Sequence, residues 1–262
     1  MNRNTIISLV VLGVGALTAL WIAAPSSSRE NAINLVRGGD KTVFVLFDLS
    51  GSTQSMRKTY ENEFEKILAT LEAGDRIIVD RITDRPLAQS TFPVNEEFVK
   101  YGILDKRGNP MFDPLNQKEL DAKRKTILKT VNNLFNSSPN SNATAIIDSL
   151  QLAERVFNTY TGKQKILVIF SDMVEIYGQN NFTVDNLTNS KIAQIVAAKS
   201  SSAQLPNLSG VKIYIVGAGA GEENSGINSQ RLFNIENFWL TYFTQTGADF
   251  TKDRYGAALL EF

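Results

Sequence analysis

Long runs of apolar residues recur along the chain and predict buried strands. A strand that is covered on both faces of a parallel sheet reads as a continuous hydrophobic run, whereas a half-buried strand alternates apolar and polar residues. Four such runs occur, at Lys41–Asp48, Arg76–Ile82, Lys165–Phe170 and Val211–Val216. The first run ends in a carboxylate, and the third is followed directly by Ser171 and Asp172. We therefore expect a sheet with polar residues at some of its strand ends.

Between these runs, apolar residues recur every three or four positions, which is the spacing of one helix face. The predicted helices cover about 55–72, 120–135, 146–157, 188–200 and 227–246, with Gly74 after the first and Gly247 after the last. A short edge strand is predicted over 87–94, and the stretch 95–117, which contains several Gly and Pro residues, is expected to be irregular. The tail from Ala248 to Phe262 is expected to add a short strand and a terminal helix.

The alternation of strands and helices predicts the fold class. It favours an α/β fold, with a doubly wound, mostly parallel central sheet and helices on both faces. We expect one domain over residues 41–262, interrupted by an insertion near 95–117. In such sheets ligands bind beyond the carboxyl ends of the strands, near the point where strand order reverses. The candidate chemistry should therefore lie at that edge.

The N-terminal residues predict a membrane anchor. Residues 5–24 form an uncharged apolar run, and about 20 residues of helix span about 30 Å, the thickness of the hydrocarbon core. A cleaved signal peptide is the alternative, but cleavage after Ala24 would leave proline just beyond the cut and isoleucine three positions before it, which is a poor site. We expect residues 1–24 to be a single-pass anchor and 25–40 to be a polar linker. Basic residues flank both ends of the run, so the distribution of positive charge does not decide its orientation. We expect the domain to be extracytoplasmic, because a short N-terminal tail before a first membrane span commonly stays in the cytoplasm.

Composition narrows the chemistry that the chain can perform. The 262 residues include no His and no Cys, which excludes Ser-His-Asp triads, thiolate nucleophiles, disulfides, iron–sulfur clusters and most transition-metal sites. The remaining oxygen donors suit hard cations such as Mg²⁺ and Ca²⁺. With 27 basic and 27 acidic residues the formal net charge is zero, and we expect no nucleic acid partner.

Five oxygen-bearing side chains stand at predicted strand ends or in a nearby loop. Asp48, Ser50 and Ser52 form an Asp-x-Ser-x-Ser sequence after the first strand, Thr144 precedes a helix, and Asp172 follows the third run. The short motif alone is common, because Ser and Asp also cap helices, and Thr144 could itself be a helix cap. Placement of both carboxylates after buried strands favours a shared cation site instead.

These residues resemble the metal-ion-dependent adhesion site of the von Willebrand factor type A (VWA) domain family, and the resemblance extends over about 40–250. It implies that Ser50, Ser52 and Thr144 approach a Mg²⁺ ion through hydroxyls, with Mn²⁺ or Ca²⁺ as alternatives. It also implies that Asp48 and Asp172 hold the ion directly or through water. The partner implied is a protein that presents a carboxylate to the ion. Thr53, inside the first motif, is not assigned a role.

The sequence therefore predicts a membrane-anchored binding module that is not an enzyme. A metal-assisted hydrolase or phosphotransferase is one alternative, although no general base is visible; a VWA scaffold with an empty metal site is another. The glycines from Gly217 to Gly221 follow a strand but depart from the dinucleotide-binding pattern, and two glutamates follow them, so we expect a loop or close packing there rather than a cofactor.

Overall fold

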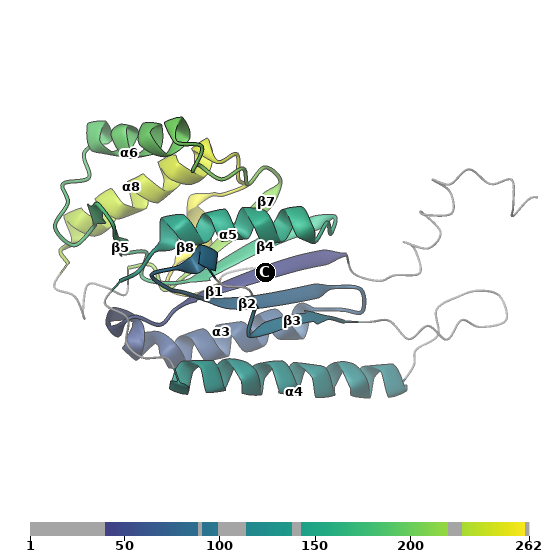
Figure 1. Ribbon diagram of the computed structural model, residues 1–262. Helices are drawn as coiled ribbons and strands as arrows, with labels where there is room; N and C mark the ends of the chain where they lie inside the picture. The colour runs from purple at the N-terminus through teal and green to yellow at the C-terminus, as the bar shows by residue number, and fades with distance from the viewer. Residues whose placement is uncertain (1–39, 89–90, 99–113, 138–142, 220–226, 260–261) are drawn as a thin grey trace, which may run out of the picture. The chain divides into compact units, whose positions relative to one another are not determined.

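The computed structural model describes residues 40–88, 91–98, 114–137, 143–219, 227–259 and 262 (Figure 1). The elements in chain order are β1 (Lys41–Asp48), η1 (Gly51–Met56), α3 (Arg57–Thr70), β2 (Arg76–Ile82), η2 (Pro86–Ala88), β3 (Val94–Glu97), α4 (Pro114–Ser137), α5 (Ile146–Thr159), β4 (Gln164–Phe170), β5 (Ile176–Tyr177), β6 (Asn180–Asn181), α6 (Asn189–Ser201), β7 (Val211–Val216), α8 (Ser229–Gln245), η3 (Lys252–Arg254) and β8 (Tyr255–Gly256).

The central sheet has six strands in the order β3-β2-β1-β4-β7-β8. Only β3 runs antiparallel to its neighbour; the other pairs are parallel. The four predicted buried strands are the four central strands, as the continuous apolar runs indicated. The fold is thus α/β with a mixed sheet, which confirms the predicted class.

The two faces of the sheet pack against different helices because successive side chains of a strand point to opposite sides. Phe44 and Leu46 of β1 pack in a core with residues of α5, α6 and α8, while Val43, Val45 and Phe47 pack in a second core with residues of α3 and α4. Figure 1 shows these two helix groups on opposite sides of the sheet. These five side chains of β1 are all fully buried, which explains why this part of the strand is continuously apolar and does not alternate with polar residues.

The edge of the sheet departs from the prediction. The edge strand is Val94–Glu97, not 87–94, and the region around Pro86–Ala88 forms a 3₁₀ turn. β3 is polar because one face of it is solvated: the Arg76 guanidinium contacts Glu97 at 2.6 Å and Asn95 at 2.8 Å. β3 and the first residues of α4 therefore occupy both ends of the stretch predicted to be irregular.

Two further elements differ from expectation. The hairpin of β5 and β6, which turns at Gly178 with a positive φ of 61°, was not predicted. The described part of the C-terminal tail contains η3 and β8 but no α-helix, so the predicted terminal helix is absent there. The long helix α8 ends, as predicted, before Gly247, which has a φ of 75°.

The apolar run 5–24 and the linker 25–40 lie outside the described residues, apart from Asp40. The anchor, its orientation and the alternative of cleavage therefore stay predictions. None of the helices in the described ranges is both long and apolar enough to cross a bilayer.

Candidate metal centre

Two chain segments that carry carboxylates meet at one edge of the sheet. β1 and β4 are adjacent parallel strands, with Phe47 in register with Phe170, so their carboxyl ends lie side by side. Asp48 ends β1, and Asp172 follows β4 after one intervening residue. Strand order reverses at this place, because β2 lies on one side of β1 and β4 on the other. This is the position at which α/β sheets bind ligands.

The Asp48 carboxylate is buried and held by two groups. Its Oδ1 accepts a hydrogen bond from the Ser50 backbone N–H at 3.0 Å, and its Oδ2 accepts one from the Ser171 hydroxyl at 2.8 Å. The Ser171 hydroxyl in turn accepts from the Met173 N–H at 2.9 Å. Burial raises the pKa of Asp48, and the hydrogen bonds from Ser50 and Ser171 oppose that rise. Ser171 thus ties the end of β1 to the loop that carries the second carboxylate.

The Asp172 carboxylate is also buried but only half satisfied. Its Oδ1 accepts from the Val174 N–H at 3.0 Å, whereas no described donor lies within hydrogen-bond geometry of its buried Oδ2; the Ser52 hydroxyl is near enough only to favour the ionised carboxyl. Burial first, and then the negative charge of Asp48, raise the pKa of Asp172 to about 6, opposed by the Ser52 hydroxyl and the Val174 N–H. The two carboxylates are therefore close enough to repel each other, and each lacks a cationic partner in the described chain.

Two serine hydroxyls of the first motif lie beside this pair. Ser50 and Ser52 share a hydrogen bond of 3.1 Å between their Oγ atoms, and Ser52 is half-buried. Thr53 behaves differently: its hydroxyl donates to the backbone oxygens of Asp48 and Ser50, at 2.8 and 3.1 Å. Thr53 therefore holds the turn together, while the hydroxyls of the two serines face each other at the site.

Thr144 lies on a segment that is tied to the Asp172 loop. Thr144 and Ile176 form an antiparallel bridge, with N–H to O distances of 3.0 and 3.1 Å, and Thr144 is buried. The alternative that Thr144 caps the following helix is wrong, because Ala145 stands at the cap and the Glu175 carboxylate accepts from the first helical N–H groups. Metal ligation by Thr144, as by the other four residues, stays a prediction.

Tyr60 of α3 lies close enough to feel the charges of both carboxylates and was not predicted to belong to the site. Its ring packs on Phe170 at 5.2 Å between centroids, and its buried hydroxyl has no partner among the described residues. Burial, followed by the charges of Asp48 and Asp172, raises the pKa of Tyr60. The hydroxyl fits against Gly217, where a Cβ atom would stand 2.5 Å from it. The glycine after β7 thus allows Tyr60 to pack closely; Gly221 lies outside the described residues, and the expectation that no cofactor binds there stays a prediction.

The donor set fits a hard dication. Two buried carboxylates, one of them with an unsatisfied oxygen, lie beside two serine hydroxyls. Unpaired buried polar atoms are uncommon in folded proteins because each costs about 1–3 kcal/mol. No cluster of three or more acidic side chains that could hold a metal occurs in the described part of the chain. Any cation here would therefore rest on two carboxylates and neutral oxygens, a set that Mg²⁺ accepts together with water.

Comparisons with known proteins give only distant structural similarities. No protein-family model matches the chain, and no curated protein matches it. Similar solved structures include an aerotolerance-related membrane protein from Bacteroides fragilis, with a TM-score of 0.34, 16% identity, and coverage of 68% of this chain and 67% of that one. The PilB minor pilin from Streptococcus sanguinis has a TM-score of 0.42 and 12% identity, with coverage of 79% and 61%. The human COPII-coat protein Sec24c has a TM-score of 0.34 and 13% identity, with coverage of 70% and 27%. At these values the similarities carry no argument about function, and the chain spans less than two thirds of the latter two proteins.

Proposed function

We propose that this chain is a membrane-anchored, VWA-like binding module that uses a divalent cation to bind an acidic group on a partner protein. The observation that carries the proposal is the buried Oδ2 of Asp172, which accepts no hydrogen bond from the described residues. A second buried carboxylate, that of Asp48, lies close enough to repel it. A cation would satisfy this oxygen and remove the repulsion between the two acids.

The ligand set would consist of Asp48 and Asp172, with the hydroxyls of Ser50, Ser52 and Thr144. Magnesium is the proposed ion, with manganese and calcium as alternatives, because all five side chains offer hard oxygen donors. The hydroxyls carry no charge, so the two carboxylates only just balance a dication. An ion held in this way keeps its attraction for an outside anion.

A carboxylate on another protein is the proposed partner group. It would complete the coordination of the ion, as the resemblance to the VWA family implies. The apolar run 5–24 would hold the module at a membrane, with the domain on the extracytoplasmic side. No catalytic role is proposed, since neither His nor Cys is present and both acids at the site are assigned to the ion.

Metal-dependent capture of a partner tests the proposal. The full chain, immobilised in mild detergent, should retain specific proteins from an extract of its native membrane with Mg²⁺ and release them with a chelator. Asp172→Asn should abolish the retention, because it removes one of the two charges that hold the ion. Asp84→Asn is the matched control, since Asp84 is an exposed aspartate just beyond the end of the neighbouring strand β2. Retention that ignores the chelator, or that survives Asp172→Asn, would contradict the proposal.

A further inference from the structure

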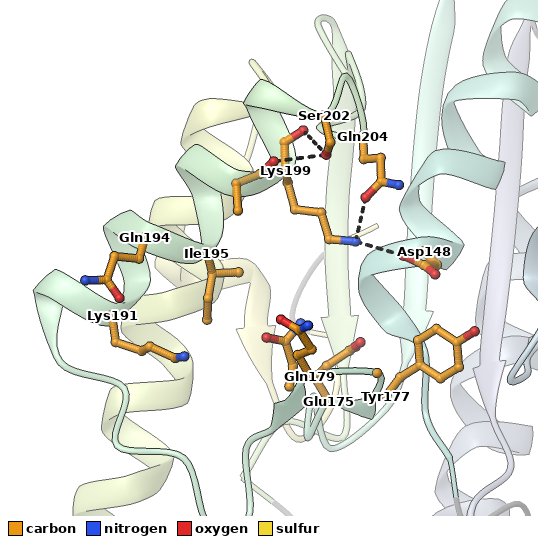
Figure 2. Close-up of a pocket in the computed structure, with 13 residues that line it drawn as sticks. Asp148, Glu175, Tyr177, Gln179, Lys191, Gln194, Ile195, Lys199, Ser202 and Gln204 are labelled. Carbon is orange, nitrogen blue, oxygen red and sulfur yellow. Dashed lines mark hydrogen bonds and ion pairs between the residues drawn. The ribbon is translucent and has the colours of Figure 1, made fainter.

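A polar cavity, separate from the candidate metal centre, opens between α5, α6 and the β5–β6 hairpin. Its volume is about 450 Å³, within the usual range of small-ligand sites, about 300–1,000 Å³. Figure 2 shows side chains from all three elements around it. Its walls carry acidic and basic side chains, and also the neutral side-chain amides of Gln179, Asn180 and Gln194.

One acidic group of this cavity is the carboxyl of Glu175, which is only 1% exposed. Its Oε2 accepts hydrogen bonds from the N–H groups of Ile146 and Ile147, at 2.7 and 3.1 Å. Its Oε1 accepts none from the described residues, and no Lys or Arg of those residues forms an ion pair with it. Burial raises the pKa of Glu175 to about 8; the charge of Asp148 adds to the rise, while the N–H groups of Ile147 and Ile146 and the charge of Lys199 oppose it. A buried acid without a cation is costly to keep ionised.

The positive group is the ammonium of Lys191 on α6. Figure 2 shows it pointing toward Glu175 and Gln179, and it forms neither an ion pair nor a side-chain hydrogen bond within the described residues. The other lysine of the cavity is already engaged: Lys199 contacts Asp148 at 3.2 Å and Gln204 at 3.3 Å. One acid and one ammonium thus face the same cavity, and they are not paired with each other.

We propose that this cavity binds a small zwitterion, an aliphatic amino acid or dipeptide, whose ammonium contacts Glu175 and whose carboxylate contacts Lys191. Each end of such a ligand supplies the charge that its protein partner lacks. Charge-assisted hydrogen bonds of this kind are stronger than neutral ones. A ligand with one charge would satisfy one end only and leave the other unpaired. The proposal does not depend on the metal centre, and binding should persist in Asp172→Asn.

A spacing series tests the proposal on the full chain in mild detergent. Calorimetric titrations with glycine, β-alanine, γ-aminobutyrate and glycylglycine vary the separation of the two charges, while acetate and methylammonium carry one charge each. At least one zwitterion should bind saturably and at least about tenfold more tightly than either single-charge ion. Lys191→Met should weaken that binding about tenfold or more, as should Glu175→Gln.

Two controls keep the outcome clear. Lys129→Met removes an exposed lysine from α4, on the opposite face of the sheet, and should leave the affinity unchanged. Lys191 is half-buried and contributes no side-chain hydrogen bond in the described residues, so its variant should fold even if Glu175→Gln does not. The proposal is overturned if no zwitterion binds saturably, if acetate or methylammonium binds as tightly as the best zwitterion, or if Lys191→Met leaves the affinity unchanged.

Discussion

Replacing Glu175 with glutamine should change the stability little below about pH 4.5 and should stabilise the protein increasingly as the pH rises from there to about 8. The carboxyl is buried against the start of α5, and its pKa rises from the ordinary 4.5 to about 8, mainly through burial. The folded state therefore binds this proton more tightly than the unfolded state does. The stability gained from Glu175 is complete below the unfolded pKa and is lost as the pH rises through the folded pKa.

The magnitude follows from the pKa values. Each pKa unit is worth about 1.4 kcal/mol, so the whole rise corresponds to at most about 5 kcal/mol. Between about pH 6 and about pH 8 the unfolded carboxyl is already ionised, and the wild-type protein should lose about 2 kcal/mol through this group. Glutamine keeps a carbonyl acceptor for the N–H groups of Ile146 and Ile147 and does not titrate, so the variant should not lose this stability.

Urea unfolding of both proteins across this pH range measures the effect. The free energy of unfolding of Glu175→Gln minus that of the wild type should rise by about 2 kcal/mol from about pH 6 to about pH 8. Other acids with raised pKa values titrate in both proteins and cancel in the difference. Glu72→Gln, at an exposed glutamate, should show a flat difference. A flat difference for Glu175→Gln as well would mean that its carboxylate is ionised at about pH 6, and the reasoning about burial would be refuted.

Three further predictions concern the candidate metal centre. Tyr60→Phe should leave the free energy of unfolding of the metal-free protein unchanged or raise it by about 1 kcal/mol, because it removes a buried hydroxyl that has no partner among the described residues. A clear decrease in urea unfolding would mean that the hydroxyl has a stabilising partner. Gly217→Ala should cost about 1–3 kcal/mol in the same assay, since φ is 100° and the new Cβ would meet the Tyr60 hydroxyl at 2.5 Å; an unchanged midpoint would contradict that packing. The increase in thermal midpoint caused by Mg²⁺ should fade as the pH drops through about 6, where Asp172 takes up a proton that competes with the ion; an equal increase at about pH 5 would argue against Asp172 as a ligand.

Features that depend on local sequence could be predicted. The central strands were found because strands covered on both faces need continuous apolar runs. Asp48 was singled out because it begins an Asp-x-Ser-x-Ser sequence at the carboxyl end of such a strand, where α/β sheets bind ligands. The edge strand was placed wrongly because Val94–Glu97 is mostly polar and pairs with β2, a partner that the local pattern does not reveal; Arg76 of β2 contacts Glu97 from 21 positions earlier. Local pattern carries no information about that contact.

Features that depend on distant contacts could not be predicted. Tyr60 has the same helical spacing as the core residues around it, so nothing marked its hydroxyl as a neighbour of two carboxylates. Glu175 stands in a mostly apolar stretch, and its partners Ile146 and Ile147 precede it by 29 and 28 positions. In both cases the informative property is burial of a polar atom, which only the three-dimensional structure reveals.

Calorimetric titration of the chelator-treated full chain with Mg²⁺, Mn²⁺ and Ca²⁺ tests the central claim most directly. Saturable binding of one ion per chain is expected, lost in Asp48→Asn and Asp172→Asn and retained in Asp84→Asn. Absence of saturable heat with all three cations, or binding that survives both substitutions at the buried aspartates, would contradict a metal site at the ends of β1 and β4.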